Sequence, residues 1–281
     1  MEKKVWYVTG ASKGLGLALV RKLVAEGHQV AATSRSLEAL EEAVGPAPAD
    51  QFLPLEVDLS DEASVAGSLL TAHEVFGRID VVVNNAGYGI GGAIEELTLE
   101  EIRHNFDVNV FAPIIVIQKV MPYLRAQRSG HIINIASIAG FAGVIGWSVY
   151  AAAKQAVIGL SDVLAQDVRS LGIHVTAVAP GAFRTQFLSK ESVVFTGTPI
   201  DDYREVRASH ARYQSIDGKQ IGDPVKAAEA LITLASTPEP PTLLFLGSDA
   251  YNRATAKMAE LSQLIEKWKC LTLSTQLEEF V

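Results

Sequence analysis

Cysteine is nearly absent from this chain, since Cys270 is the only one among its 281 residues. A single cysteine excludes an internal disulfide and a metal site built from cysteine ligands. Sparse cysteine is typical of a reducing compartment, so we expect a cytoplasmic protein. The histidines do not show H-x-x-x-H or a similar ligand spacing, and we therefore predict no metal site; they are His28, His73, His104, His131, His174 and His210.

Positive charge and long apolar runs are also in short supply. The chain has 24 Lys and Arg against 32 Asp and Glu, which gives a net charge of −8 and argues against a general nucleic-acid binder. Residues 1–8 run directly into a strand-like stretch, not into an apolar signal region, and no later segment reads as long enough to cross a bilayer. We expect neither nucleic acid nor an integral membrane segment.

Apolar residues, by contrast, are plentiful enough for a sizeable core, at 48% of the chain. Short β-branched and aromatic runs alternate with stretches of helical period, with no repeat, low-complexity tract or linker between them. The pattern predicts one doubly wound α/β domain over 1–281, with about seven parallel strands and helices on both faces. The expected strands are 5–9, 29–33, 52–57, 79–83, 131–136, 173–179 and 243–246. The expected helices are 17–25, 37–44, 62–76, 98–128, 149–171, 223–236 and 254–269.

A glycine-rich turn follows the first expected strand. Residues 9–16 read T-G-A-S-K-G-L-G and lead into an apolar-periodic helix. Glycines permit a close backbone approach, and the helix N-terminus offers unpaired N–H groups to a phosphate. The spacing is G-x-x-x-G-x-G, not the G-x-G-x-x-G of the general dinucleotide fingerprint. A plain strand-to-helix connection is the alternative interpretation.

The end of the second strand bears on which dinucleotide would bind. A NAD-binding fold carries an acid there for the ribose 2′-hydroxyl, whereas this chain has T-S-R-S at residues 33–36. Arg35, with Lys13 in the glycine turn, suits a 2′-phosphate. We predict NADP(H) over NAD(H). The alternative is that Arg35 extends into solvent.

Polar residues follow two further strands. Asp58, with Leu59 beside it, could bond an adenine amino group, or could only open the next helix together with Ser60 and Asp61. Asn84-Asn85-Ala86-Gly87 fits the ligand-facing edge of an α/β sheet, and equally a turn. Asn109 lies inside the long helix 98–128. Such an amide can bond a neighbour, or open the helix ladder and hold a water.

Ser137, Tyr150 and Lys154 form the densest candidate for chemistry. Tyr150 and Lys154 are four residues apart, so on a helix they share one face. A nearby ammonium favours the phenolate and is expected to lower the tyrosine pKa from its ordinary value of about 10. Ser137 brings a hydroxyl that could bond a substrate oxygen. A surface Tyr and Lys on an ordinary helix is the alternative.

Two segments depart from the regular alternation. Residues 186–222 show no clear strand and are interpreted as a lid, or alternatively as a surface excursion. Residues 251–281 form a C-terminal extension whose apolar stripe we expect to pack against the body or a partner subunit; the stripe is Met258, Leu261, Leu264, Ile265 and Trp268. Residues 138–147, Phe183, Phe187 and Leu188 are apolar, which favours a lipophilic substrate.

Together these motifs resemble the short-chain dehydrogenase/reductase family, in its order and spacing across roughly residues 3–236. The resemblance implies hydride transfer between a nicotinamide and a ketone, aldehyde or alcohol, as in carbonyl reductases. It implies Tyr150 as general acid/base, Ser137 on the substrate oxygen, Lys154 on the nicotinamide ribose, and Asn109 in a proton relay. It also implies a cofactor cleft lined by Gly10, Ser12, Lys13, Gly14, Leu15, Gly16, Arg35, Asp58, Leu59, Asn85, Ala86, Gly87, Tyr150, Lys154, Pro180, Gly181 and Thr185.

One departure from the family pattern concerns the C-terminus. Many members end in a V-D-G-G-like segment that supports a tetramer, whereas residues 243–250 read L-L-F-L-G-S-D-A and about thirty residues follow. Such a tail resembles members acting on lipophilic carbonyls, and we expect a homo-dimer or homo-tetramer. Two other functions stay open: a cofactor-sensing regulator without catalysis, and a lyase or epimerase that uses the cofactor transiently.

Overall fold

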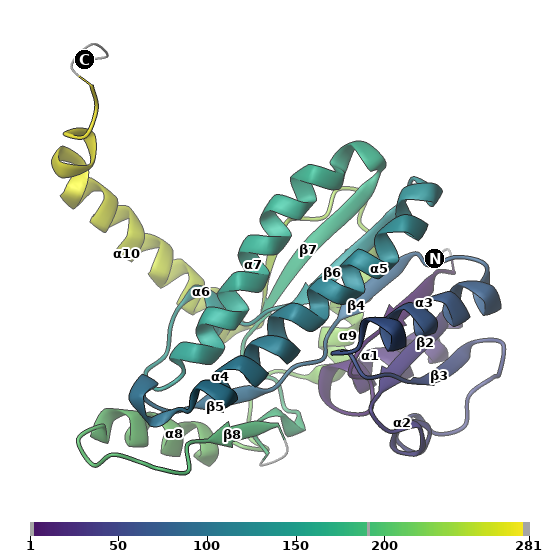
Figure 1. The fold of residues 1–281 in the computed structure, drawn as a ribbon, viewed down its shortest axis with the longest axis horizontal. Helices are drawn as coiled ribbons and strands as arrows, with labels where there is room; N and C mark the ends of the chain where they lie inside the picture. Colours follow the sequence, from purple (N-terminus) through teal and green to yellow (C-terminus); the bar gives the residue numbers. More distant parts are fainter. Residues whose placement is uncertain (1–2, 190–191, 278–281) are drawn as a thin grey trace.

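The fold is built on one seven-stranded parallel sheet. The computed structural model describes residues 3–189 and 192–277. Its strand order is β3-β2-β1-β4-β6-β7-β9, and every neighbouring pair is parallel (Figure 1). The expected doubly wound α/β fold is confirmed. The strands are β1 (Val5–Val8), β2 (Gln29–Ser34), β3 (Phe52–Glu56), β4 (Val81–Asn84), β6 (Gly130–Ile135), β7 (Ile173–Pro180) and β9 (Leu243–Leu246).

Helices cover both faces of this sheet. Their bounds are α1 (Gly14–Ala25), α2 (Leu37–Val44), α3 (Glu62–Phe76), α4 (Leu99–Phe106), α5 (Ala112–Gln127), α6 (Ile138–Phe141), α7 (Ser148–Val168), α8 (Arg204–Ser215), α9 (Pro224–Ala235) and α10 (Ser248–Leu273). Successive strand residues point to opposite faces. Trp6 and Val8 therefore pack with α1 and α9, while Tyr7 packs with α3, α5 and α7. The core is thus two apolar layers, one on each side of the sheet.

The expected helix over 98–128 contains one wide turn. α4 and α5 are joined by a π-helical segment, Asp107–Phe111, with Asn109 at its centre. The Asn109 side-chain amide donates to the carbonyl of Asn105, four residues earlier, and so competes with the backbone ladder. The second interpretation of Asn109, an opened helix ladder, therefore describes the backbone here.

This long helix also corrects an expectation about membranes. By length and composition the 29-residue stretch Leu99–Gln127 could cross a bilayer, although no such segment was expected. In this fold 44% of its most apolar window is buried, and Val116 and Val120 belong to the sheet core. A core helix passes the same test, so the composition is weak evidence for a span.

Residues 186–222 are more ordered than the sequence indicates. They contain α8 and the strand β8 (Val193–Phe195), which pairs in parallel with β5 (Gly89–Gly91). The expectation of no strand is wrong, because a three-residue strand gains its stability from a partner about one hundred residues away. Residues 138–147 likewise begin with the short helix α6, capped by Ser137. Residues 190–191 of the expected lid lie outside the described residues.

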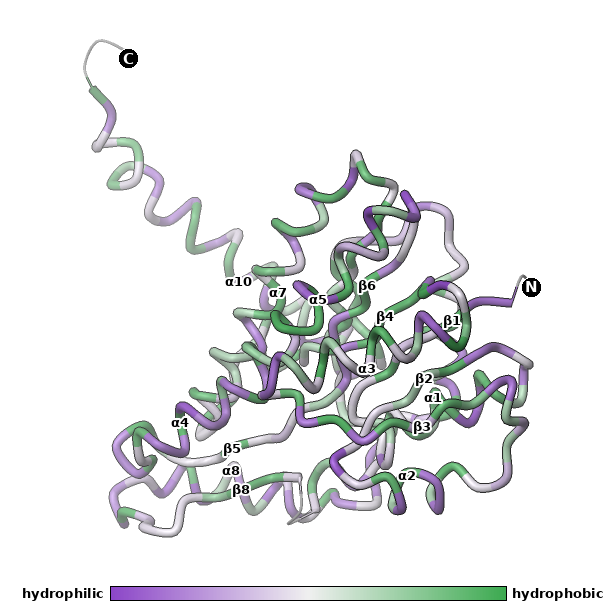
Figure 2. The backbone as a smooth tube through the Cα atoms, turned by 45° about the vertical axis from the view of Figure 1, so that its right-hand side comes forward, coloured by the Kyte–Doolittle hydropathy of each residue, from purple (hydrophilic) through white to green (hydrophobic). Residues whose placement is uncertain are grey.

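The C-terminal helix α10 leads away from the body of the protein (Figures 1 and 2). Ala250 and Ala254 at its base are buried, whereas Met258, Ile265 and Trp268 are 57%, 72% and 53% exposed. The expectation that this stripe packs against the body of the protein is therefore wrong. Packing against a partner subunit stays a prediction. Residues 278–281 of the expected extension lie outside the described residues.

Candidate active site

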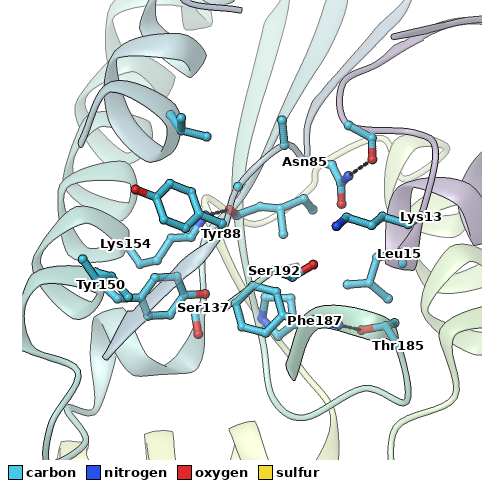
Figure 3. Close-up of a pocket in the computed structure, with 18 of the residues that line it drawn as sticks. Lys13, Leu15, Asn85, Tyr88, Ser137, Tyr150, Lys154, Thr185, Phe187 and Ser192 are labelled. Carbon is cyan, nitrogen blue, oxygen red and sulfur yellow. Dashed lines mark hydrogen bonds between the residues drawn. The ribbon is translucent and has the colours of Figure 1, made fainter. Parts of the chain in front are cut away.

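A cavity of about 1230 Å³ opens at the carboxyl ends of the central strands. Ligands of open α/β sheets bind at this edge, where the strand order reverses between β1 and β4. Tyr150, Ser137 and Lys154 lie on one side of the cavity, and Lys13, Leu15 and Asn85 on the other (Figure 3). The cavity is large enough for a dinucleotide together with a small substrate, because a drug-sized ligand needs only roughly 300–1,000 Å³.

The glycine turn lies tightly against the end of β4. Gly10 has φ +64°, and a Cβ there would lie 2.7 Å from the Cα of Ala86. The Asn85 amide donates to the carbonyls of Thr9 and Gly10, each at 2.9 Å. The Thr9 hydroxyl in turn accepts from the backbone N–H groups of Asn85 and Ala86. Asn85 therefore holds the glycine turn against the end of β4 through these hydrogen bonds.

The start of α1 is suited to a phosphate. Its first turn is Gly14-Leu-Gly-Leu17, so glycine and apolar side chains leave the backbone N–H groups open to an anion. The turn residues line the cavity with their predicted partners from β4: Gly10, Ser12, Lys13, Gly14, Leu15, Asn85, Ala86 and Gly87. These residues fit a dinucleotide pyrophosphate by their backbone geometry and the dipole of α1.

Within the described part of the chain, two of the predicted site residues, Gly16 and Asn109, lie behind the cavity wall and do not line the cavity. A Cβ on Gly16 would lie 2.5 Å from the Asn85 amide nitrogen, so this glycine allows α1 to pack on Asn85. Asn109 is fully buried, and its amide donates to the carbonyl of Tyr88 at 3.0 Å.

Arg35, Asp58 and Leu59 line the far end of the same cavity. Arg35 is exposed directly after β2, beside Ser34. Asp58 accepts hydrogen bonds from the backbone N–H and the hydroxyl of Ser60, at 2.9 and 2.6 Å. These bonds lower the pKa of Asp58, the bond from the hydroxyl more than the bond from the N–H. Asp61, and not Asp58, caps α3. Asp58 therefore lines the cavity, and its carboxylate is bonded to Ser60, the residue before the cap of α3.

Tyr150 and Lys154 lie one helical turn apart on the buried face of α7. Their exposed fractions are 6% and 4%. The Lys154 ammonium donates to the carbonyl of Ile135 at 3.0 Å and lies 5.9 Å from the centre of the Tyr150 ring. Ser137 lies beside them, two residues after the end of β6, and its hydroxyl accepts from the N–H of Ala139. The helix period and the strand end thus bring the three predicted side chains to one wall.

The pKa of Tyr150 moves against expectation. Burial raises it to about 12, although a hydrogen bond with the Ser137 hydroxyl lowers it. Burial also lowers the pKa of Lys154 to about 8. The expectation that Lys154 lowers the tyrosine pKa is wrong for this site, because removal from water outweighs a cation held on the Ile135 carbonyl. Tyr150 is therefore a protonated phenol at neutral pH, which is the form that donates a proton.

Asn109 supports this wall from behind. Its side-chain nitrogen donates two hydrogen bonds, to the carbonyls of Tyr88 and Asn105. Its side-chain oxygen is buried without a hydrogen-bond partner among the described residues. A Cβ on Gly87 would lie 2.7 Å from that oxygen and 3.2 Å from the Lys154 nitrogen. The oxygen and the ammonium therefore border the same small space, in which a water molecule would satisfy both.

Aromatic and aliphatic side chains form the rest of the cavity. Trp147 packs edge-on against Tyr150 and Tyr213, with ring centroids 6.1 and 5.3 Å apart, and Phe187 lies 5.9 Å from Tyr150. Phe183, Phe187 and Leu188 line the cavity as the sequence predicted, with Pro180, Gly181 and Thr185 beside them. Sequence reasoning missed Tyr88, Ser192, Val194, Tyr213, Asp249 and Arg253, which reach the cavity from distant segments without a local motif.

The segment over this cavity is fastened by Glu96. Its side chain is fully buried and accepts from the backbone N–H groups of Ala93 and Ile200, each at 2.7 Å. It also pairs with the guanidinium of Arg207 on α8. The expected lid is thereby held to residues 93–96 by several bonds on one carboxylate.

Comparisons with known proteins agree with this geometry. Residues 4–193 match the family model for short chain dehydrogenases. The chain is 36% identical to oxidoreductase BOA17 of Botryotinia fuckeliana over 273 residues, which cover 97% of this chain and 99% of that protein. The protein belongs to the short-chain dehydrogenase family. A short-chain dehydrogenase from Streptomyces avermitilis superposes with a TM-score of 0.90 at 35% identity, covering 98% of this chain and 100% of that one.

Two further solved structures of similar fold have a nicotinamide cofactor in place. A 3-ketoacyl-(acyl-carrier-protein) reductase from Brucella melitensis complexed with NADH has a TM-score of 0.72 at 25% identity, over 87% of this chain and 96% of that one. ElxO with NADP bound has a TM-score of 0.75 at 25% identity, over 89% of this chain and all of that one. The chain is thus an oxidoreductase of this family, and its cavity fits a nicotinamide dinucleotide.

Proposed function

We propose that the protein interconverts a lipophilic ketone or aldehyde and the corresponding alcohol with NADP(H), and that Tyr150 is the general acid/base. The observation that carries the proposal is the buried Tyr150 hydroxyl, hydrogen-bonded to Ser137, on the cavity wall opposite the glycine turn. When bound, the nicotinamide supplies the hydride for reduction or accepts it in oxidation. The protein contributes orientation and a matched proton donor.

Each polar side chain of the wall has a separate task in carbonyl reduction. Tyr150 donates its proton to the carbonyl oxygen as the carbon takes up hydride, so charge on that oxygen does not build up. Ser137 donates a hydrogen bond to the same oxygen and fixes its position. Lys154 supplies the replacement proton, since burial holds its pKa at about 8. Asn109 holds the water through which that proton is restored from solvent.

The NADP(H) preference rests on the charges at the end of β2. Arg35 borders the cavity together with Ser34, and Lys13 lines it from the glycine turn. Two cations favour a 2′-phosphate, and a charge-assisted hydrogen bond contributes roughly 1.5–3 kcal/mol. Arg35→Ser is expected to lower kcat/KM for NADPH about tenfold or more and to leave that for NADH nearly unchanged. Arg21→Ser is the control, since Arg21 donates to Ala43 on the surface. A wild-type preference for NADH would refute the assignment.

The substrate class rests on the apolar walls around Tyr150. Trp147, Phe187 and Leu188 line the cavity and belong to one apolar cluster with the catalytic tyrosine. These side chains bind aryl and alicyclic groups by burying them from water, and they leave a carboxylate poorly solvated. A panel of ketones should show faster reduction of aryl and alicyclic ketones than of small charged oxo-acids. The reverse order would contradict the proposed class.

Replacement of Tyr150 tests the function itself. Tyr150→Phe keeps the ring and its packing but removes the proton donor, so kcat should fall by roughly 10²–10⁴-fold. The dissociation constant for NADPH should change little. Tyr203→Phe is a matched control, because the Tyr203 hydroxyl bonds the exposed Glu95. A Tyr150→Phe enzyme at the wild-type rate would leave the cofactor-sensing regulator as the better account.

The exposed stripe on α10 supports a homo-oligomer. Within it, Met258, Leu261, Ile265 and Trp268 follow one another at intervals of three, four and three residues, as in helices that pair along a seam. A second copy of the chain is the partner in this proposal. Leu261→Glu with Ile265→Glu should reduce the mass measured by light scattering to that of a monomer. Ala256→Glu with Gln263→Glu, on the other face of the helix, should leave the oligomer intact.

A further inference from the structure

The base of α10 is joined to the loop that follows β7. The Asp249 carboxylate accepts from the backbone N–H of Ala182 at 2.8 Å. On its other side, the Ala182 carbonyl accepts from the N–H of Gly222 at 3.0 Å. A Cβ on Gly181 would lie 2.0 Å from an Asp249 oxygen, so only glycine allows the carboxylate to lie against this backbone. Asp249 thus fixes the wall that contains Pro180 and Thr185.

The next turn of α10 is joined to the segment that follows Ser137. The Arg253 guanidinium donates to the carbonyl of Ala142, just past α6. Ala250 and Ala254 are 0% and 5% exposed and pack with Ile138 and Ala142. Since α6 begins directly after Ser137, these contacts support the backbone that carries the serine hydroxyl.

Asp249 and Arg253 are four residues apart, so they share one face of the helix, and both line the cavity that contains Tyr150. We propose that these two residues are positioning residues: Asp249 holds the loop 181–183 and Arg253 holds the segment 138–142, so that one rigid helix sets the separation between the two walls. This inference rests on the proposed function, because those walls are the ones that hold the cofactor and the substrate oxygen.

A positioning role makes a specific kinetic prediction. A displacement of about 1 Å between reacting groups can cost roughly 10²-fold in rate, so kcat is the sensitive quantity. Asp249→Ala removes the acceptor for Ala182 and should lower kcat for ketone reduction about tenfold or more and weaken NADPH binding several-fold. Asp249→Asn keeps an acceptor oxygen and should stay within about threefold of the wild type. Arg253→Ala should lower kcat with a smaller effect on NADPH binding.

Amide hydrogen exchange provides a readout that does not depend on turnover. In the full-length protein, Asp249→Ala should speed exchange in a peptide covering 181–184, and Arg253→Ala in one covering 138–143. Lys257→Ala and Glu260→Ala serve as controls, because this exposed pair lies one turn further out on the same helix. Both controls should match the wild type in exchange, kcat and NADPH affinity.

The outcomes separate this inference from the proposed function. If the wild type reduces no carbonyl compound, the proposed function fails, and the exchange data together with NADPH affinity still decide the role of Asp249. Unchanged exchange at 181–184 in Asp249→Ala would overturn the inference. Faster exchange with wild-type kcat and NADPH affinity would overturn it as well, because the contact would then be structural only. If Asp249→Ala does not fold, Arg253→Ala and Arg253→Lys give the same test, with the lysine variant expected to recover most of the rate.

Discussion

The two sides of the cavity are held in different ways. The cofactor side is made mainly by neighbours in sequence: β1, the glycine turn, α1 and β2 follow one another, and Asn85 and Ala86, directly after β4, bond the turn. The substrate side joins segments about one hundred residues apart, through the β5–β8 pairing and the bonds of Glu96 to Ile200 and Arg207. The first side is therefore stiff by local geometry, whereas the second depends on a few distant bonds.

This difference assigns separate tasks to the two sides. The backbone of the cofactor side tolerates few substitutions, and this suits the binding of a cofactor that is common to a whole family. The segment over the substrate side is attached through the Glu96 carboxylate and the aromatic cluster around Trp147. Its residues can be altered without disturbing the sheet, because these contacts lie outside the two core layers. Substitutions on the two sides should thus affect different measured quantities.

The largest effect is expected at Gly10. Gly10→Ala forces a side chain into φ +64° and places its Cβ 2.7 Å from the Cα of Ala86. Strain of roughly 1–3 kcal/mol and an overlap of similar cost should lower the free energy of unfolding and weaken NADPH binding by at least about tenfold. Thermal unfolding and a fluorescence titration with NADPH measure both.

Gly14 provides the matched comparison. It has φ +62°, but the nearest atom that an added Cβ would meet, the Thr185 Cβ, is 3.8 Å away. Gly14→Ala should therefore cause backbone strain without a steric overlap, and should lower the free energy of unfolding by about 1 kcal/mol. Equal effects of the two substitutions would show that the contact with Ala86 contributes nothing.

A smaller effect, confined to the substrate side, is expected at Glu96. Glu96→Ala leaves two backbone N–H groups and Arg207 without their acceptor, at a cost of about 2–4 kcal/mol. We expect faster proteolysis within residues 193–215 and a higher KM for the ketone, with NADPH affinity unchanged. Glu96→Gln keeps an acceptor oxygen and should be milder. Loss of NADPH affinity in Glu96→Ala would show that the two sides are not independent.

The last prediction concerns the pH dependence of stability at Lys154. Burial lowers its pKa from 10.5 to about 8, so between those values the unfolded chain binds more protons than the native protein. The free energy of unfolding contributed by this residue should accordingly rise as pH increases from about 8 to 10.5, by at most about 3.4 kcal/mol. Chemical denaturation across this range measures it. Lys154→Met should abolish the rise, and a rise of the same size in that variant would assign it to other groups.

The sequence predicted residues that line the cofactor side of the cavity, because the determinants of their positions are local. Glycine spacing, strand ends and helix period follow within a few residues of each other, and the four-residue interval brought Tyr150 and Lys154 to one face. Elements joined to distant partners could not be found this way. β5 and β8 are three residues long each, and Asp249 reaches the cavity only because β9 places α10 beside β7.

The direction of the Tyr150 pKa shift could not be predicted from spacing either. The four-residue interval gives proximity, and proximity to an ammonium alone favours the phenolate. Burial by Trp147, Phe187 and the surrounding cluster reverses that direction, and burial depends on segments far away in the sequence. The substrate side therefore determines the protonation state of the residue that the sequence identified most readily.

The most direct test of a neutral Tyr150 is its ionisation in the cofactor-free protein. Near-ultraviolet absorbance of tyrosinate can be recorded against pH for the wild type and for Tyr150→Phe, and the difference between the two curves reports this one hydroxyl. Because its pKa is raised to about 12, the difference should be close to zero at about pH 10, where an ordinary tyrosine is half ionised. A difference curve with its midpoint at or below about pH 10 would contradict a Tyr150 pKa that burial has raised.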